Sequence, residues 1–393
     1  MTRVNRLIEY VRGLYENKNG RELYFEYKND IEEVTPQECF EIFHNLLTND
    51  YSATEIFNVL DKVINVFYKS LSSYQWEKPE NDNFLLDLTL ENEALIQKTN
   101  AIKSIIKDDI DFEVKKEKLI PKIEDLKKFD DHYLKKENIL FPYMEKAMPK
   151  FEGTSIMWAL HDIVREQLKN TINLLKDKSS TEIEVNKALG ELFFGMLGIV
   201  KKEDLILFPS ASEVLSRDIW YKMHKQSLEY GFPFIDKNID EVEHKIEESS
   251  QLNIREGEYK IKTKTGELSF EDVLLIFNTL PVDITFVDEH NKVKYFSDNK
   301  DRIFPRSPAV IGREVKNCHP PASVHVVEEI VESFRSGKED MAKFWINMKG
   351  RKILIQYFAL RDKNNNYKGT LEVSQDITEI KELEGERRLL KFS

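Results

Sequence analysis

Acidic and histidine side chains lie on the apolar faces of four consecutive helical patterns. The patterns cover residues 83–106, 118–147, 154–177 and 183–207. At about 100° per residue, Glu91 falls at the margin of the first apolar face, and Glu137 falls near the middle of the second. His161 lies within the third face and Glu203 at the centre of the fourth. Because buried carboxylates without compensation cost many kcal/mol or become protonated, a bound cation is expected among them.

Carboxylates and histidine that face the interior of a four-helix bundle are the recurring ligands of di-iron and di-manganese sites. A fifth candidate ligand, His132, precedes Glu137 by five positions, which is about 140° around a regular helix. The two side chains can bind one ion only across a π-helical turn, and otherwise they belong to different metals. The alternative for any one buried Glu is a structural role, such as capping a neighbouring helix or pairing with Lys136 or Lys202.

The second and fourth patterns end on related sequences. The run LKKENILFP (134–142) returns as VKKEDLILFP (200–209), one residue longer. This echo indicates two-fold-related helix pairs, each closing on the repeated motif and presenting one Glu about a turn before its end. The Lys-Lys pairs inside the echo, at 135–136 and 201–202, are expected on solvated faces rather than at anion sites.

Composition disfavours several classes of protein. Lys and Arg number 58 against 70 Asp and Glu, and the resulting net charge of −12 argues against a mainly electrostatic nucleic-acid binder. The longest apolar stretches, such as Leu192–Val200, are far shorter than the roughly 20 residues that cross a bilayer. Two cysteines, Cys39 and Cys318, cannot build a disulfide framework, and no signal-peptide pattern opens the sequence. We therefore expect a cytoplasmic protein without a membrane anchor.

The 393 residues are expected to form several domains. A small helical domain (1–75) precedes the helical bundle (80–230), a connector with a short hairpin (231–269) and a final domain (270–393). In the final domain the predicted order is two strands, helices and three strands, which suits a five-stranded antiparallel sheet with helices on one face. The expected fold class is multidomain, α followed by α+β, with an up-down four-helix bundle in the α part.

Several runs in the bundle and in the final domain resemble known families. HYLKKENILFPYMEK (132–146), SIMWALHDIVREQ (155–167) and the second echo resemble the hemerythrin-like, HHE cation-binding bundle. LPVDITFVDEHNKVKYFS (280–297) and GTLEVSQDITEIKELEGERRLL (369–390) resemble a PAS domain. Over most of its length the chain is similar to proteins that join a small helical domain of unknown function, this bundle and a PAS domain.

The resemblance implies a non-haem iron site, as a di-metal centre, in the bundle. Residues at the matching positions, which are the implied metal ligands, are Glu91, His132, Glu137, His161 and Glu203. Only two histidines lie within residues 80–210, so a five-histidine site is impossible and reversible oxygen carriage is not expected. A carboxylate-rich site and an empty relic of a metal site both stay open. Iron, manganese and zinc are not distinguished, since His and carboxylate sites accept all three.

The resemblance also implies a ligand pocket between the PAS sheet and its helices. Cys318 and His319, just before the helix predicted at 322–336, are the candidates to coordinate haem or another small ligand there. The alternative is that Asn317–Pro321 is only a rigid turn, and a PAS domain without ligand can serve as a dimerisation surface. Asp376-Ile377-Thr378 matches the motif that ties the last PAS strand to an outgoing helix.

These observations predict a sensory or regulatory protein that responds to redox state, oxygen, nitric oxide or iron status. We expect a homodimer through the PAS domain, an unidentified signalling partner and a small-molecule or gas ligand, with neither nucleic acid nor membrane as partner. Two alternatives stay open: a di-iron oxidoreductase or repair enzyme, and a metal-free interaction scaffold whose inward acids are protonated or paired with basic residues. Catalysis is not favoured, because the sequence contains no His-Glu-x-x-His, Cys-x-x-Cys, phosphate-binding loop or nucleophile elbow.

Overall fold

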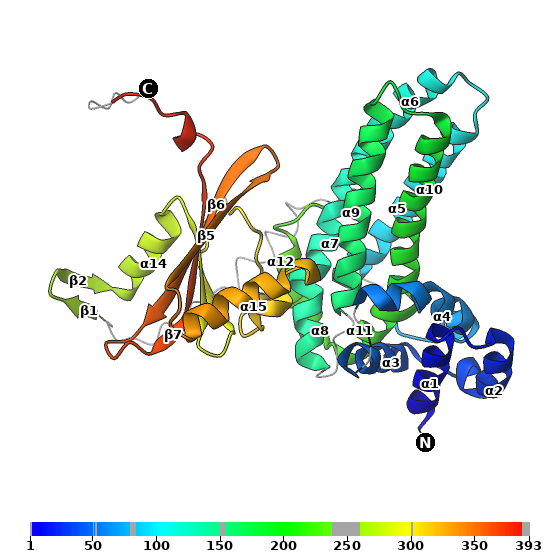
Figure 1. Ribbon diagram of the computed structural model, residues 1–393, viewed down its shortest axis with the longest axis horizontal. Coiled ribbons are helices and arrows are strands. Elements are labelled where there is room, and N and C mark those ends of the chain that lie inside the picture. Colours follow the sequence, from blue (N-terminus) through cyan, green and yellow to red (C-terminus); the bar gives the residue numbers. More distant parts are fainter. Residues whose placement is uncertain are drawn as a thin grey trace. The chain divides into compact units, whose positions relative to one another are not determined.

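The structure is a computed structural model (Figure 1). It describes residues 2–49, 51, 53–78, 84–148, 154–237, 260–299 and 302–386. Contacts divide the chain into two compact units, Met1–Lys245 and Ile246–Ser393. The first unit is helical and the second contains a five-stranded antiparallel sheet, which confirms the expected fold class. The central part of the expected connector, residues 238–259, lies outside the described residues.

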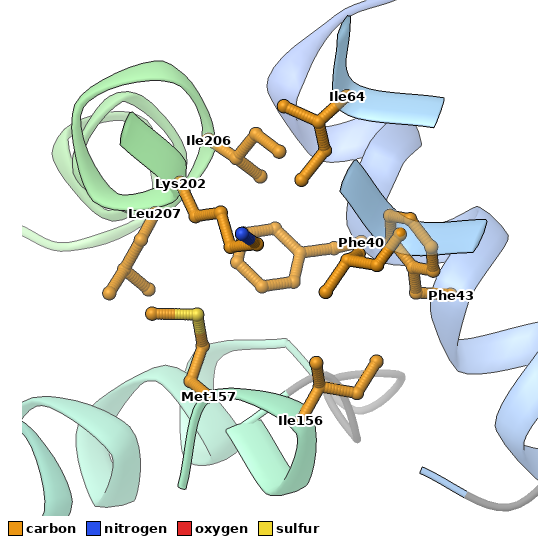
Figure 2. A pocket seen from close by; sticks show the side chains of 9 residues that line it. Phe40, Phe43, Ile64, Ile156, Met157, Lys202, Ile206 and Leu207 are labelled. Carbon is orange, nitrogen blue, oxygen red and sulfur yellow. The ribbon is translucent and has the colours of Figure 1, made fainter. Parts of the chain in front are cut away.

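Four helices at the N-terminus pack on one another and on the bundle. They are α1 (Arg3–Tyr15), α2 (Gly20–Glu32), α3 (Pro36–Asn49) and α4 (Ala53–Ser73). Figure 2 shows the apolar hollow where Phe40 and Phe43 of α3 and Ile64 of α4 meet Met157 of the bundle. At the same seam Lys202 Nζ donates to Asp61 Oδ1 over 2.6 Å. The N-terminal helices therefore hold the end of the bundle through apolar packing and an ion pair.

The bundle consists of four long helical segments. The first is α5 (Phe84–Lys107), and the third is α9 (Thr154–Lys176). The second is broken into α6 (Phe112–Asp125), a 3₁₀ turn (Leu126–Phe129), α7 (Asp130–Lys135), a π-helical turn η2 (Lys136–Leu140) and α8 (Phe141–Ala147). The fourth comprises α10 (Glu182–Lys202), a π-helical turn η3 (Glu203–Leu207) and α11 (Phe208–Val214), and α12 (Arg217–Ser227) follows. Among the described helices, none is long and apolar enough to cross a membrane.

The two echoed sequences form the two π-helical turns. The prediction that the repeated motif closes the helix is wrong for the fourth segment, which continues through α11 to Val214 rather than ending at residue 207. The second segment runs past Pro142 to Ala147, where its predicted range ends. A proline in a regular helix clashes with the carbonyl four residues earlier. Here that carbonyl belongs to Asn138 or to Leu205, and both residues lie in the wider π-helical turns. The turns therefore let each helix pass a proline that would otherwise end it.

The second helical segment also starts earlier than predicted, at Phe112 rather than near residue 118. The side chain of Asp111 accepts hydrogen bonds from the backbone N–H groups of Glu113 (2.9 Å) and Val114 (3.4 Å). This N-cap satisfies two of the donors that a helix start leaves unpaired. Because the sequence after the cap is rich in lysine, apolar periodicity alone does not reveal the helix start.

The described residues of the second unit form a hairpin, a five-stranded sheet and two α-helices. The hairpin pairs β1 (Lys260–Thr263) with β2 (Gly266–Ser269). The sheet has the order β4-β3-β7-β6-β5, formed by β3 (Asp283–Asp288), β4 (Val293–Phe296), β5 (Met341–Met348), β6 (Arg351–Arg361) and β7 (Tyr367–Asp376). The helices are α14 (Phe270–Thr279) and α15 (Pro321–Arg335), and α15 packs against β7.

The Asp376-Ile377-Thr378 motif closes the sheet. Asp376 Oδ1 accepts from the Thr378 hydroxyl (2.6 Å) and from the Thr378 N–H (2.9 Å). Thr378 Oγ1 in turn accepts from the Lys352 N–H (2.8 Å), and the Ile377 N–H donates to the Lys352 carbonyl (2.8 Å). The motif therefore ties the end of β7 to the start of β6, and a short 3₁₀ turn at Ile380–Glu382 comes after it.

Candidate metal centre

His132 lies between two carboxylates in the interior of the bundle. Its Nδ1 is 2.8 Å from Glu91 Oε2, and its Nε2 is 3.0 Å from Glu203 Oε2. The three side chains are fully buried and come from α5, α7 and η3. Asn92 Nδ2 donates to Glu203 Oε2 as well, over 2.9 Å. The structure therefore brings three of the five expected ligands into direct contact.

Two lysines fill the space beside these carboxylates. Lys135 Nζ donates to Glu91 Oε1, and Lys136 Nζ donates to Glu203 Oε1. Both lysine side chains are fully buried. Aromatic rings cover the amino groups on another side, with Lys135 Nζ 4.4 Å from the centre of the Phe232 ring and Lys136 Nζ 4.8 Å from that of Tyr133. Each carboxylate of the His132 group thus already has a lysine partner.

The other two expected ligands form a separate group. His161 Nδ1 lies 2.7 Å from Glu137 Oε1. The guanidinium of Arg165 donates to both oxygens of Glu137, over 3.0 and 3.1 Å, and to Asp130 Oδ1 over 2.7 Å. The His161 ring stacks on Tyr133 at 4.3 Å between centroids. Glu137 is therefore held by a bidentate arginine and a histidine.

Burial decides the protonation states in the His132 group. It lowers the pKa of His132 well below the ordinary value, so the imidazole is neutral. A neutral imidazole donates from one nitrogen and accepts at the other, so one of the two carboxyl groups that face it carries a proton. Burial raises the pKa of Glu91 to about 7, against the opposing effect of Lys135. Glu91 is therefore the carboxyl that fits the role of donor to His132.

The lysines respond to the same burial in the opposite direction. Burial lowers the pKa of Lys135, partly offset by Glu91, and it lowers the pKa of Lys136 well below the ordinary value. For Lys135 and Glu91 the two shifts bring the pKa values of the amine and the carboxyl closer together. A single proton held by either group leaves the pair without net charge. The lysines therefore balance the carboxylates whichever atom holds the proton.

The Glu137 group is charged and balanced as well. Burial lowers the pKa of Arg165, but the carboxylates of Glu137 and Asp130 outweigh this effect and the pKa is raised. Arg165 is therefore a permanent cation. Burial also lowers the pKa of His161 well below the ordinary value, so its imidazole is neutral. Because its Nδ1 faces a carboxylate that is already paired with a cation, His161 donates from Nδ1 and leaves Nε2 as an acceptor.

The π-helical turn foreseen between His132 and Glu137 is present, at Lys136–Leu140. The two side chains nevertheless meet different partners, Glu91 and Glu203 in one case and His161 and Arg165 in the other. The turn therefore leaves the two side chains in separate groups, and metal binding by either group stays a prediction.

The prediction that the Lys-Lys pairs lie on solvated faces is wrong for three of the four lysines. Lys135 and Lys136 are fully buried and Lys202 is 7% exposed. For Lys135 and Lys136 the physical reason is a change in the angle per residue: a 3₁₀ turn ends at Phe129 and a π-helical turn starts at Lys136, so the 100° rule does not hold across this segment. Lys202 lies in the regular helix α10 and is covered by the N-terminal helices, where it pairs with Asp61. Arg165 was also missed, although it follows His161 by four residues and so shares its face.

The two residues considered for the PAS pocket lie in a 3₁₀ turn, Val315–Cys318, and at its end. His319 Nδ1 donates a hydrogen bond to the Val315 carbonyl over 2.8 Å. Cys318 Sγ lies 3.7 Å from the Glu314 carbonyl. Burial lowers the pKa of His319. These contacts are those of a rigid turn into α15, and haem or ligand binding by the two residues stays a prediction.

Comparison with known proteins finds one matching domain in each of the two units. The sequence model of the hemerythrin HHE cation binding domain matches residues 85–211, and that of the PAS domain matches residues 273–378. A search of curated proteins gives no match. The crystal structure of a C-terminal domain from Streptococcus mutans is 33% identical, covering 32% of this chain and 98% of its own, with a TM-score of 0.31. The crystal structure of the PAS domain of a protein from Colwellia psychrerythraea is 16% identical. The match covers 28% of this chain and 97% of that domain, with a TM-score of 0.23.

A metal of the kind that the HHE domain implies does not fit the donors as they are arranged. Both oxygens of Glu91, Glu137 and Glu203, and both nitrogens of His132, already face side-chain partners. His161 Nε2 is the exception, since it is buried without a hydrogen-bond partner among the described residues. Within that part of the chain no group of three or more His, Cys, Asp or Glu side chains has a metal-binding arrangement.

The domain assignments nevertheless agree with the fold of both units. The segments from α5 to α11 span the matched range 85–211, and α14 to β7 span the matched range 273–378 except its last two residues. This pair of domains is typical of sensory and signalling proteins. The chain therefore combines a member of the hemerythrin HHE cation-binding family with a member of the PAS family.

Proposed function

We propose that this chain is a cytoplasmic sensory or regulatory protein that signals by association, with the PAS domain as the surface through which two copies meet. The observation that carries this proposal is α14, an amphipathic helix with no buried residue. Its apolar side chains include Phe270, Leu275 and Ile276, which are 62%, 59% and 43% exposed. Large exposed apolar side chains that gather on a surface mark interaction sites on soluble domains, and Leu275 and Ile276 are neighbours on α14.

A second copy of the chain is the partner that we propose for α14. PAS domains commonly dimerise, and an isologous contact lets a single helix face serve both copies. The adjoining hairpin exposes two further apolar side chains, Ile261 (49%) and Leu268 (40%), which are partners across its two strands. Helix α14 has acidic residues in its first turn, Glu271 and Asp272, so pairing of the apolar face is expected to leave these charges at the rim.

Sedimentation of the full chain tests this proposal. The wild type is expected to be a dimer at micromolar concentration, and Leu275→Glu combined with Ile276→Glu is expected to make it a monomer. The matched control is Phe25→Glu on α2, where an equally exposed aromatic residue (63%) lies outside the PAS domain. A monomeric wild type, or a double variant that remains dimeric, would refute association through α14.

An iron-dependent form of this function remains a second candidate. It would use Glu91, His132, Glu137, His161 and Glu203 as ligands and would sense redox state, oxygen, nitric oxide or iron. Two observations favour it, the HHE match and His161 Nε2, a buried acceptor without a hydrogen-bond partner among the described residues. This candidate requires that the lysine partners of Glu91 and Glu203 move away. Metal analysis of the full chain separates the two candidates.

A further inference from the structure

We propose that Lys135 and Lys136 replace metal ions as the partners of the inward carboxylates, so that the bundle keeps its interior acids without binding a metal. This inference concerns the bundle alone and does not depend on how the PAS domain associates. Each lysine meets a different carboxylate, Glu91 in one case and Glu203 in the other. His132 joins the two pairs through its two nitrogens.

The position of the lysine amino groups is fixed by their surroundings. Both side chains are fully buried, so neither can reach solvent without opening the bundle. The Phe232 ring covers Lys135, and it comes from the segment after α12. The same segment is tied to α5, because Lys237 Nζ donates to the buried Asp87. The two amino groups therefore occupy fixed positions beside the carboxylates, as a bound ion would.

The charges of the interior balance without an added ion. Besides a neutral histidine, each inward acid meets one lysine or arginine: Glu91 meets Lys135, Glu137 meets Arg165 and Glu203 meets Lys136. Proton transfer inside a lysine–carboxyl pair does not alter this balance. One or two divalent ions added to a balanced interior would leave uncompensated positive charge, which is costly in a buried site.

Removal of both lysines is expected to convert the His132 group into a metal site. When the two amino groups are removed, Glu91 and Glu203 remain buried on either side of His132. Their Oε1 atoms, which accepted from the lysines, then have lost those donors. Two carboxylates and a histidine are ligands that Zn²⁺ and Fe²⁺ accept. Because methionine keeps the length and apolar volume of lysine, Lys135→Met with Lys136→Met opens the donors without creating a large cavity. The double variant is therefore expected to recruit a metal that the wild type does not hold.

Metal content and thermal stability of the full chain test the inference. Wild type and the double variant are purified from cells supplemented with iron and zinc, and their metals are counted. Wild type is expected to hold no stoichiometric metal and to keep its Tm in chelator. The double variant is expected to hold about one metal ion per chain and to lose Tm in chelator, because metal binding then contributes to folding. Added Zn²⁺ should restore that Tm.

A surface control and a charge-neutral variant complete the test. Lys128, whose side chain is 71% exposed, is one of two lysines that pair with Asp125, and Lys128→Met should behave as wild type. Where the double variant does not fold, adding Glu91→Gln and Glu203→Gln should restore a metal-free fold. Stoichiometric metal in wild type that supports its Tm would overturn the inference. So would a double variant that matches wild type in Tm without metal, or a charge-neutral variant that fails to fold.

Discussion

Lys136 donates a hydrogen bond to Glu203 in the interior of the bundle, although 67 positions separate the two residues in the sequence. Neither side chain is exposed. Both residues begin a π-helical turn, η2 in one case and η3 in the other. The two copies of the sequence echo therefore meet through a lysine of the first and a glutamate of the second. This contact occupies a carboxylate that the family resemblance would give to a metal.

The first prediction concerns the stability that this contact protects. Lys136→Met leaves Glu203 buried without its lysine and is expected to lower the free energy of unfolding by about 3–5 kcal/mol. Glu203→Gln in the same chain should recover part of that loss, because it removes the uncompensated charge. Denaturant unfolding of the two single variants and the double variant measures the coupling. The control is Lys201→Met, because Lys201 donates to Asn65 on the surface; it should lower the free energy of unfolding by less than about 0.5 kcal/mol. Strictly additive effects of the substitutions at positions 136 and 203 would show that the pair is not coupled.

The second prediction concerns the arginine that holds Glu137. Arg165→Met removes both hydrogen bonds to a carboxylate that is nearly buried, and it is expected to cost about 3–5 kcal/mol. Arg165→Lys keeps the charge but not the bidentate geometry. It should therefore lower the free energy of unfolding by less than the methionine variant does, but still measurably. Lys169→Met is the control, since its pair with Glu166 is exposed on both sides. Equal losses for the methionine and lysine variants would show that charge makes no contribution.

The third prediction concerns a glycine of the PAS sheet. Gly369 has φ +141°, and a Cβ there would lie 2.2 Å from the backbone oxygen of Val287 on the neighbouring strand. Gly369→Ala is therefore expected to separate β7 from β3 and to cost more than the roughly 1–3 kcal/mol of backbone strain alone. Gly350→Ala, also at positive φ but with no atom within 4 Å of the added Cβ, bears only the strain. Hydrogen exchange of the β3 and β7 amides reports the difference, and equal protection in both variants would contradict it.

The fourth prediction is a pH dependence at the end of the sheet. Hydrogen bonds from Thr378 lower the pKa of Asp376 below its ordinary value. A depressed carboxyl pKa gives stability that is present above the unfolded pKa and is lost as pH falls through the folded one. Protection of the β6 and β7 amides should therefore fall with acid below about pH 4. Asp376→Asn should flatten that dependence, and an unchanged acid profile in the variant would remove Asp376 as its source.

The sequence predicted the helices and strands well, but it predicted poorly which face of the second bundle segment each residue lies on. Apolar periodicity located α9, since Met157, Val164 and Ile172 are all buried, and it located the strands by alternation. Apolar periodicity did not predict the burial of Lys135 and Lys136, because a 3₁₀ turn and a π-helical turn shift the faces between Leu126 and Leu140. Pairing of a buried Glu with Lys136 was named only as the structural alternative to a metal, and the structure shows that contact with Glu203. The same shift directs His132 and Glu137 to different partners. Periodicity assumes a constant angle per residue, and the candidate site lies where that angle changes.

The most direct measurement is the metal content of the full chain, purified anaerobically from iron-replete cells, beside a Glu203→Ala, His161→Ala double variant. We expect that neither protein holds stoichiometric metal and that chelator leaves the Tm of the wild type unchanged. About two irons per chain in the wild type, absent from the variant, would contradict the replacement of metal by lysine. That result would mean that the lysines yield Glu91 and Glu203 to a di-metal centre.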